Sequence, residues 1–125
     1  MVVTSSAKGY SETVSALIEG IERRGLTVLA RVDHGAGARS VGMELGDEEV
    51  VLFGNPRSGT PLMQADRRIG IELPLRMLIW REGDDVMLGH GDPRELAEAY
   101  EVSEHRATLE QMAALLRELA SEAAG

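Results

Sequence analysis

The 125-residue sequence contains no cysteine. Disulfide bonds, thiolate catalysis, zinc sites built on cysteine and iron–sulfur clusters are therefore excluded. Its aromatic residues are one tryptophan, two tyrosines and one phenylalanine, too few for the platform on which single-stranded nucleic acids stack. No apolar run approaches the ~20 residues that a membrane-spanning helix requires. We therefore expect neither a nucleic acid nor a membrane as a partner.

Positive charge is also scarce, since 13 Lys and Arg face 21 Asp and Glu and leave a net charge of −8. Lys8 is the sole lysine, so nearly all of the positive charge is arginine, which pairs well with carboxylates and phosphates. This balance disfavours a nucleic-acid surface, which needs a basic patch. Residues 1–7 lack both the basic and the apolar segment of a signal peptide, so the expected location is the cytoplasm.

Hydrophobic residues make up 43% of the sequence and charged residues 27%, which is ordinary for a globular protein. No repeat, low-complexity tract or linker divides the chain, and its length suffices for a core without metal or disulfide support. We therefore expect a single domain over residues 1–125.

Two long amphipathic helices stand out. The first is expected to be capped by Ser11 and to end at Gly25, with apolar residues at helical spacing between them. The second follows Thr108 and Gln111, which resemble a capping box, and carries one apolar stripe. A short helix is expected after Asp92, because Asp92 and Pro93 suit the cap and the first helical position.

Apolar and alternating segments predict six strands, with the third and fourth joined as a hairpin. They are Val2–Ser5, Leu26–Asp33, Val41–Leu45, Glu48–Phe53, Leu75–Arg81 and Val86–Leu88. The small residues from His34 to Ser40 predict a flexible loop. The expected order is β-α-β-β-β-(short α)-β-β-α-α, an α+β fold with an antiparallel sheet.

The segment from Gly54 to Thr60 is the first candidate site. It follows a buried strand and reaches Thr60, which we expect to cap a helix because a proline follows. Free main-chain amides, Arg57 and the Thr60 hydroxyl could bind a phosphate or carboxylate there. A structural reading remains open, in which Gly54 and Gly59 only supply unusual backbone angles and Asn55 and Thr60 satisfy local donors. The segment lacks the Gly-Lys-Ser/Thr of a P-loop.

Asp33 and His34 form the second candidate site. An imidazole beside a carboxylate at a strand end could act as a general base, or could ligate a metal or haem. Adjacent strand residues point to opposite faces, so a surface or capping role for His34 stays open. The spacing of His34, His90 and His105 matches no metal motif, and we expect no metal site. Phe53, Trp80 and the methionines Met43, Met63, Met77 and Met87 could line an apolar pocket, but three of these methionines lie on predicted strands, which favours core packing.

Several blocks of the sequence resemble one family. They are Arg31-Val32-Asp33-His34, the run from Phe53 to Met63 (Phe-Gly-Asn-Pro-Arg-Ser-Gly-Thr-Pro-Leu-Met), the run from Leu73 to Trp80, and Asp92-Pro93. Together they resemble the family known as domain of unknown function 302, over nearly the whole chain. The resemblance implies a TBP-like fold, in which an antiparallel sheet carries two helices on one face, often as a homodimer. It implies no activity. Family members often read Tyr-Asn-Asp-Pro where this chain reads His90-Gly91-Asp92-Pro93.

The leading hypothesis is a homodimeric module that binds a small anionic or apolar-anionic ligand near His34 and the segment from Gly54 to Thr60. Three alternatives remain. The first is a hydrolase or isomerase with His34 as base, assisted by Asp33 or Asp92. The second is a haem-binding dimer with His34 or a methionine as ligand, and the third is a structural or interaction protein without a ligand. The sequence identifies no cofactor and no catalytic residue.

Overall fold

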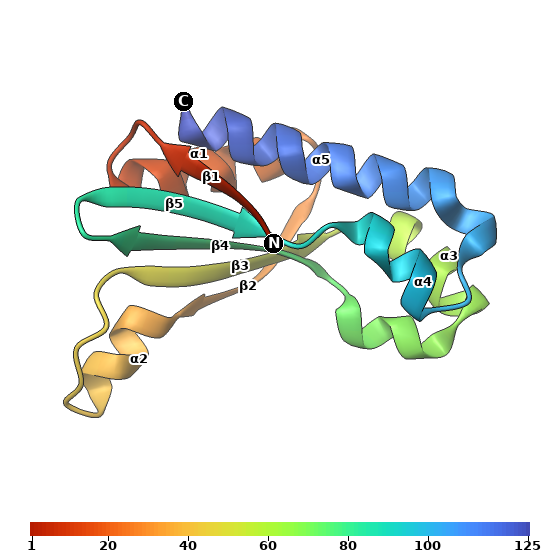
Figure 1. The fold of residues 1–125 in the computed structure, drawn as a ribbon, viewed down its shortest axis with the longest axis horizontal. Coiled ribbons are helices and arrows are strands. Elements are labelled where there is room, and N and C mark those ends of the chain that lie inside the picture. The colour runs from red at the N-terminus through yellow and green to blue at the C-terminus, as the bar shows by residue number, and fades with distance from the viewer.

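A computed structural model describes residues 1–125. Its five strands form one antiparallel sheet in the order β1-β5-β4-β3-β2 (Figure 1). The strands are β1 (Val2–Ser6), β2 (Thr27–Asp33), β3 (Glu48–Gly54), β4 (Leu75–Glu82) and β5 (Asp85–His90). Strands β1 and β2, which are closest to the N-terminus, therefore form the two edges of the sheet.

Two long helices, α1 (Tyr10–Arg23) and α5 (Arg106–Ala124), pack side by side on one face of the sheet (Figure 1). Their apolar stripes meet the alternate strand residues that point toward them. The core that results contains Val14, Leu17, Ile21, Val51, Phe53, Met77, Ile79, Val86, Leu88, Leu116, Leu119, Ala120, Ala123 and Ala124. Burial of this apolar surface is the main force that holds the two helices to the sheet.

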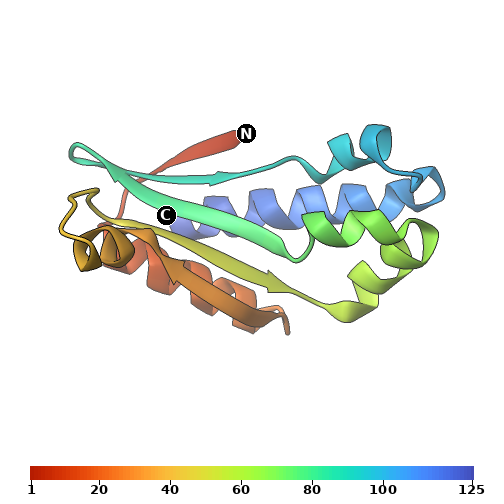
Figure 2. The ribbon, with the colours of Figure 1, turned by 90° about the horizontal axis from the view of Figure 1, so that it is seen from below.

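The first half of α5 extends past the ends of the strands, where short helices surround it (Figure 2). These are α3 (Pro56–Ala65), the 3₁₀ segments η1 (Arg67–Glu72), η2 (Pro93–Glu95) and η3 (Ser103–His105), and α4 (Leu96–Ala99). A second apolar cluster of Leu62, Ile69, Val102, Leu109 and Met112 fixes them to α5. None of the helices combines the length and the apolar run that crossing a membrane requires.

The opposite face of the sheet carries no helix, and we call it the open face (Figure 1). Because side chains alternate along a strand, the residues between the core positions point to this face. The strand register places Val3, Ala30, Val32, Val50, Leu52, Leu78, Trp80 and Met87 on it, together with Glu48, Arg76 and Glu82. The open face is thus largely apolar.

The expected fold class is confirmed, since an antiparallel sheet carries the two main helices on one face. The predicted hairpin of Val41–Leu45 with Glu48–Phe53 is wrong. Strand β3 bonds to β2 on one side and β4 on the other, so no free edge of β3 remains for residues 41–45.

The predicted flexible loop is also wrong, because His34–Ser40 forms helix α2. The Asp33 carboxylate accepts a hydrogen bond from the Ala36 N–H at 2.8 Å and caps this helix. Backbone bonds from Val41 and Met43 to the Ala38 carbonyl then close its end.

Three helices start earlier than predicted. Helix α3 begins at Pro56 with Asn55 as its cap, and Pro61 lies inside the helix. Helix α5 begins at Arg106, so Thr108 lies within its first turn rather than before it. The bond from the His105 N–H to the Val102 carbonyl forms a 3₁₀ turn that leads directly into α5. Helix α1 starts one residue before Ser11, because Gly9 takes the cap position.

Candidate functional site

A cavity of about 430 Å³ opens where the start of β2 and the end of β3 meet α3, η1 and α5. Its apolar lining includes Leu26, Leu29, Met63, Leu73, Met112 and Leu115. This volume lies in the range of small-molecule sites, which are mostly apolar with a few polar groups. The cavity therefore has the size and surface of a ligand pocket.

Glycines form part of its wall. Gly54, Gly59 and Gly70 all line the cavity and come from three different segments. A Cβ atom added to Gly59 would lie 3.5 Å from Leu73 Cδ1, which is ordinary van der Waals contact. The absence of a side chain at Gly59 thus keeps space open, and a larger residue there would occupy it.

The polar groups of the cavity are neutral. Asn55, Ser58, Thr60, Thr108 and Gln111 line it, and no charged residue does. A buried charge without a partner is costly, whereas a hydroxyl or amide can hydrogen-bond one polar group of a ligand. The lining therefore suits a mainly apolar molecule better than a free anion.

The main-chain amides that we expected to be free are engaged by the chain itself. The Arg57 N–H donates to Asn55 Oδ1 at 3.0 Å. The Ser58 and Gly59 N–H groups donate to the Asn55 carbonyl at 3.0 and 3.2 Å. The expectation of outward amides is therefore wrong at these positions, because the segment is the first turn of α3 rather than a loop before it. Arg57 is exposed and does not line the cavity.

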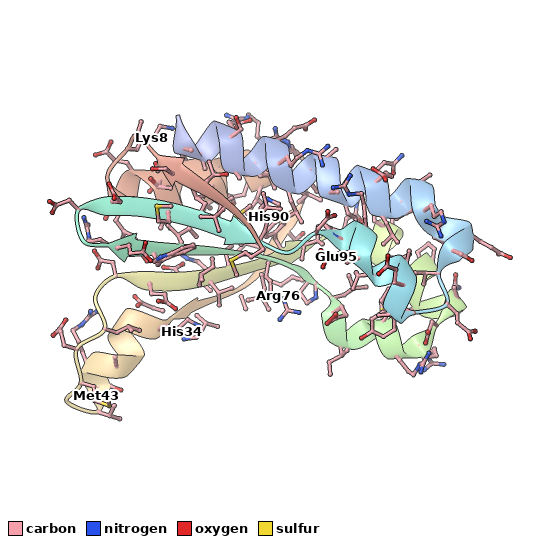
Figure 3. The ribbon with its side chains drawn as sticks, in the orientation of Figure 1. Lys8, His34, Met43, Arg76, His90 and Glu95 are labelled. Carbon is pink, nitrogen blue, oxygen red and sulfur yellow. The ribbon has the colours of Figure 1, made fainter.

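The structure does not bring the two candidate sites together. Thr27 pairs with Gly54 at one end of β2, whereas Asp33 pairs with Glu49 at the other end. The six residue steps from Thr27 to Asp33 separate the ends by about 20 Å. His34 is exposed at the start of α2 (Figure 3), and the Asp33 carboxylate caps that helix. His34 therefore stands apart from the cavity.

His90 is buried beneath the helices, with 4% of its surface exposed. Its Nδ1 lies 2.7 Å from the Gly91 carbonyl oxygen, and its Nε2 has no hydrogen-bond partner. Asp92 caps η2 as expected, accepting from the Arg94 N–H at 3.0 Å. The Arg94 guanidinium lowers the pKa of Asp92 to about 2. Neither residue lines the cavity.

Sequence reasoning missed a polar cluster on the helix side of the sheet. Glu49 is buried and accepts two bonds from Arg31, at 2.6 and 3.3 Å. Burial, together with the charge of Glu49, raises the pKa of Tyr10 to about 12, and the Arg81 guanidinium lies 6.0 Å from the Tyr10 ring centre. Glu49, Val51 and Phe53 are spaced two residues apart, so they share the buried face of the strand. This spacing could have predicted a buried carboxylate at Glu49.

Three comparisons bear on the chain. The model of a family described as Domain of unknown function DUF302 matches residues 1–120. Fluoride-specific ion channel FluC 1 of Brucella suis and FluC 2 of Brucella melitensis are 41% identical to the chain over 101 residues. That match covers 80% of this chain but only 40% and 37% of those proteins. The chain thus spans less than half the length of either relative.

The crystal structure of an uncharacterized conserved DUF302 protein from Bacillus stearothermophilus has the same fold. It superposes with a TM-score of 0.88 over 98% of this chain and 96% of that chain, at 15% sequence identity. The resemblance to this family that the blocks from Arg31 to His34 and from Phe53 to Met63 indicated is thus confirmed. Since the family match extends over nearly the whole sequence, the chain belongs to the DUF302 family.

Proposed function

We propose that this protein is a binding module, and that its ligand is a small, mainly apolar molecule held in the cavity beside α3. The observation that carries the proposal is the cavity itself, which has an apolar lining, a wall of three glycines and a volume of about 430 Å³. Side chains that serve only to pack a protein core normally leave no empty volume of this size.

The proposal keeps the location expected from the sequence for Gly54, Asn55, Gly59 and Thr60, but changes the chemistry. No charged group lines the cavity, and the first amides of α3 are engaged. The polar side chains on its wall can fix one hydroxyl, carbonyl or amide of the ligand, while the apolar lining receives the rest. His34, Asp33 and Arg57 have no part in this site.

The test is a titration with the neutral apolar dye N-phenyl-1-naphthylamine, using wild type, Gly59→Met and Gly37→Met. Both glycines lie in helices, and a Cβ atom at Gly37 would meet nothing within 4 Å. We expect wild type and Gly37→Met to bind alike and Gly59→Met to bind at least about tenfold more weakly, since its side chain fills the cavity. Equal binding by Gly59→Met, with its fold verified by circular dichroism, would remove the site.

We also propose that the protein acts as a homodimer in the cytoplasm. The support is the open face, where apolar side chains from all five strands are covered by no helix and Val3 and Val32 are 48% and 43% exposed. Contiguous apolar surface of this kind commonly marks an interaction site.

A second functional proposal rests on the Brucella relatives. In them, a segment 41% identical to this chain belongs to a protein named as a fluoride-specific ion channel. We propose that this chain also works beside such a channel, with the cavity ligand as a signal. Deletion of its gene should change the fluoride concentration that halts growth of the host, and the wild-type gene should restore it. Identical growth curves at every fluoride concentration would remove this proposal.

A further inference from the structure

We propose that the open face is the surface on which two copies of this chain meet, and that the copies are inverted, so that a projecting arm of each lies over the far end of the other's sheet. This inference rests on the proposed homodimer and assigns its interface. We define the arm as residues 34–47, which contain α2 and the segment that leads to β3.

The open face has the composition of an interface centre. Val50, Leu52, Leu78 and Trp80 lie on the interior strands β3 and β4 and are half-buried by their neighbours. Val3 and Val32, on the edge strands, are 48% and 43% exposed. The charged residues of this face lie near the strand ends, as expected for an apolar interface core with a polar rim.

The arm carries apolar side chains that its own chain does not cover. Val41, Met43 and Leu45 are 70%, 67% and 53% exposed. Figures 1 and 3 show that the arm leaves the sheet on the side away from α5, with Met43 near its tip. Three exposed apolar residues within five positions indicate a contact made with another molecule.

The size of the sheet indicates that the arm takes part. Five strands about 4.8 Å apart and about 20 Å long present roughly 400 Å² of projected area. A stable interface of standard size buries about 800 Å² on each partner. Side-chain relief adds accessible area beyond this flat projection, and the arm supplies further apolar surface on the same side of the molecule.

Charge then selects the relative orientation. Arg76 lies at one end of the open face, opposite Leu52, whereas Glu48 and Glu82 lie at the other end, near Trp80. None of these three has an ion-pair partner within the chain. The Arg76 guanidinium lies 3.5 Å from the Glu72 carbonyl oxygen at the end of η1, and Figure 3 shows it on the side of the sheet away from α5. Two copies stacked with like ends together would place like charges opposite each other, whereas inversion brings Arg76 toward the partner's Glu48.

Inversion also gives the arm a counterpart. The arm begins at the acidic end, because Asp33 pairs with Glu49 there. In an inverted pair it reaches the Arg76 end of the partner, where Ile71 of η1 is 77% exposed. The contact is made twice by symmetry, which is the property of a two-fold dimer.

The first experiment measures the monomer–dimer dissociation constant by analytical ultracentrifugation. Arg76→Glu should raise this constant by about tenfold, because two symmetric ion pairs become repulsive. Adding Glu48→Arg to Arg76→Glu should restore it, since the swapped charges face each other again in the inverted arrangement. Trp80→Glu, on the central strand β4, should give monomers.

The second experiment exploits the absence of cysteine. With a short bis-maleimide, the double variant Met43→Cys/Ile71→Cys should form covalent dimers, while either single variant should not. Dimers cross-linked through Met43→Cys alone would overturn the inversion. A wild-type chain that stays monomeric would overturn the homodimer itself. A wild-type dimer that Trp80→Glu and Arg76→Glu leave intact would overturn only the interface assigned here.

Discussion

Two aspartates, Asp66 and Asp92, act as local anchors in the same way. Each caps a 3₁₀ segment and is followed two residues later by an arginine whose guanidinium bonds back to it. Asp66 also accepts a bond from the Glu101 N–H at 3.0 Å, which ties η1 to the segment after α4. These carboxylates hold the short helices around α5 in place.

Because of both caps, we expect the free energy of unfolding to fall in acid. The Arg68 guanidinium holds the pKa of Asp66 well below its usual range, and Arg94 lowers the pKa of Asp92 from 3.8 to about 2. Since the folded pKa lies below the unfolded one, the stabilisation is complete above about pH 5 and is lost as the pH falls through 3.8 toward 2. Asp92→Asn keeps a capping oxygen but has no charge, so its free energy of unfolding should fall less over this range.

Urea unfolding of wild type and Asp92→Asn at pH 7, 4 and 2.5 measures the effect. Asp84→Asn, in the turn between β4 and β5, serves as the control, because the Asp84 carboxylate accepts no hydrogen bond and forms no ion pair. Parallel loss of stability in wild type and Asp92→Asn would contradict the account.

At the scale of single elements, helix α2 contains two glycines that should respond in opposite ways to substitution. A Cβ atom on Gly35 would overlap the Gly46 carbonyl oxygen, whereas one on Gly37 would meet nothing within 4 Å. Gly37→Ala should therefore stabilise the fold by about 0.5–1 kcal/mol through helix propensity and reduced unfolded-state entropy. Gly35→Ala should destabilise it by about 1–3 kcal/mol through overpacking. Chemical denaturation of both variants measures this, and shifts of the same sign would show that α2 does not pack as described.

The elements that the sequence predicted well are those with strong periodicity. Helices α1 and α5 and strands β2 to β5 have apolar residues at regular spacing, and each was placed within a few residues of its true bounds. Helix α2 has no such stripe. It depends on the Asp33 cap, a single local signal without a periodic stripe behind it, and on close packing of Gly35 against Gly46, which no local pattern contains.

Two misplaced features have equally specific causes. Val41, Met43 and Leu45 alternate like a strand, but both edges of β3 are occupied by other strands. Helix α3 offers two consecutive start signals, Asn55-Pro56 and Thr60-Pro61, and the structure uses the first. The choice matters for function, because it converts the expected anion loop into a turn whose amides are already bonded.

At the scale of the whole molecule, the cavity is formed by segments that are distant in sequence. The run from Gly54 to Met63 forms one wall, and the others come from the start of β2, from η1 and from α5. Sequence reasoning could identify that one wall, since its motif is local. It could not find the cavity, because the register of β2 and β3 and the position of α5 decide which side chains meet there.

None of the side chains placed in the proposed interface lines the cavity. Ligand binding and self-association should therefore respond to different substitutions. Gly59→Met should leave the monomer–dimer dissociation constant unchanged, and Arg76→Glu should leave the dye affinity per chain unchanged. Loss of both properties in either variant would indicate a damaged fold.

Whether the cavity holds a small apolar molecule can be measured by native mass spectrometry of the protein purified from its own host, which reports any small-molecule mass that the protein retains. The account predicts a dimer that carries additional small-molecule mass, with the same added mass on Gly37→Met and none on Gly59→Met. An added mass that persists in Gly59→Met, or a wild-type protein that carries none and also fails to bind the dye, would contradict it.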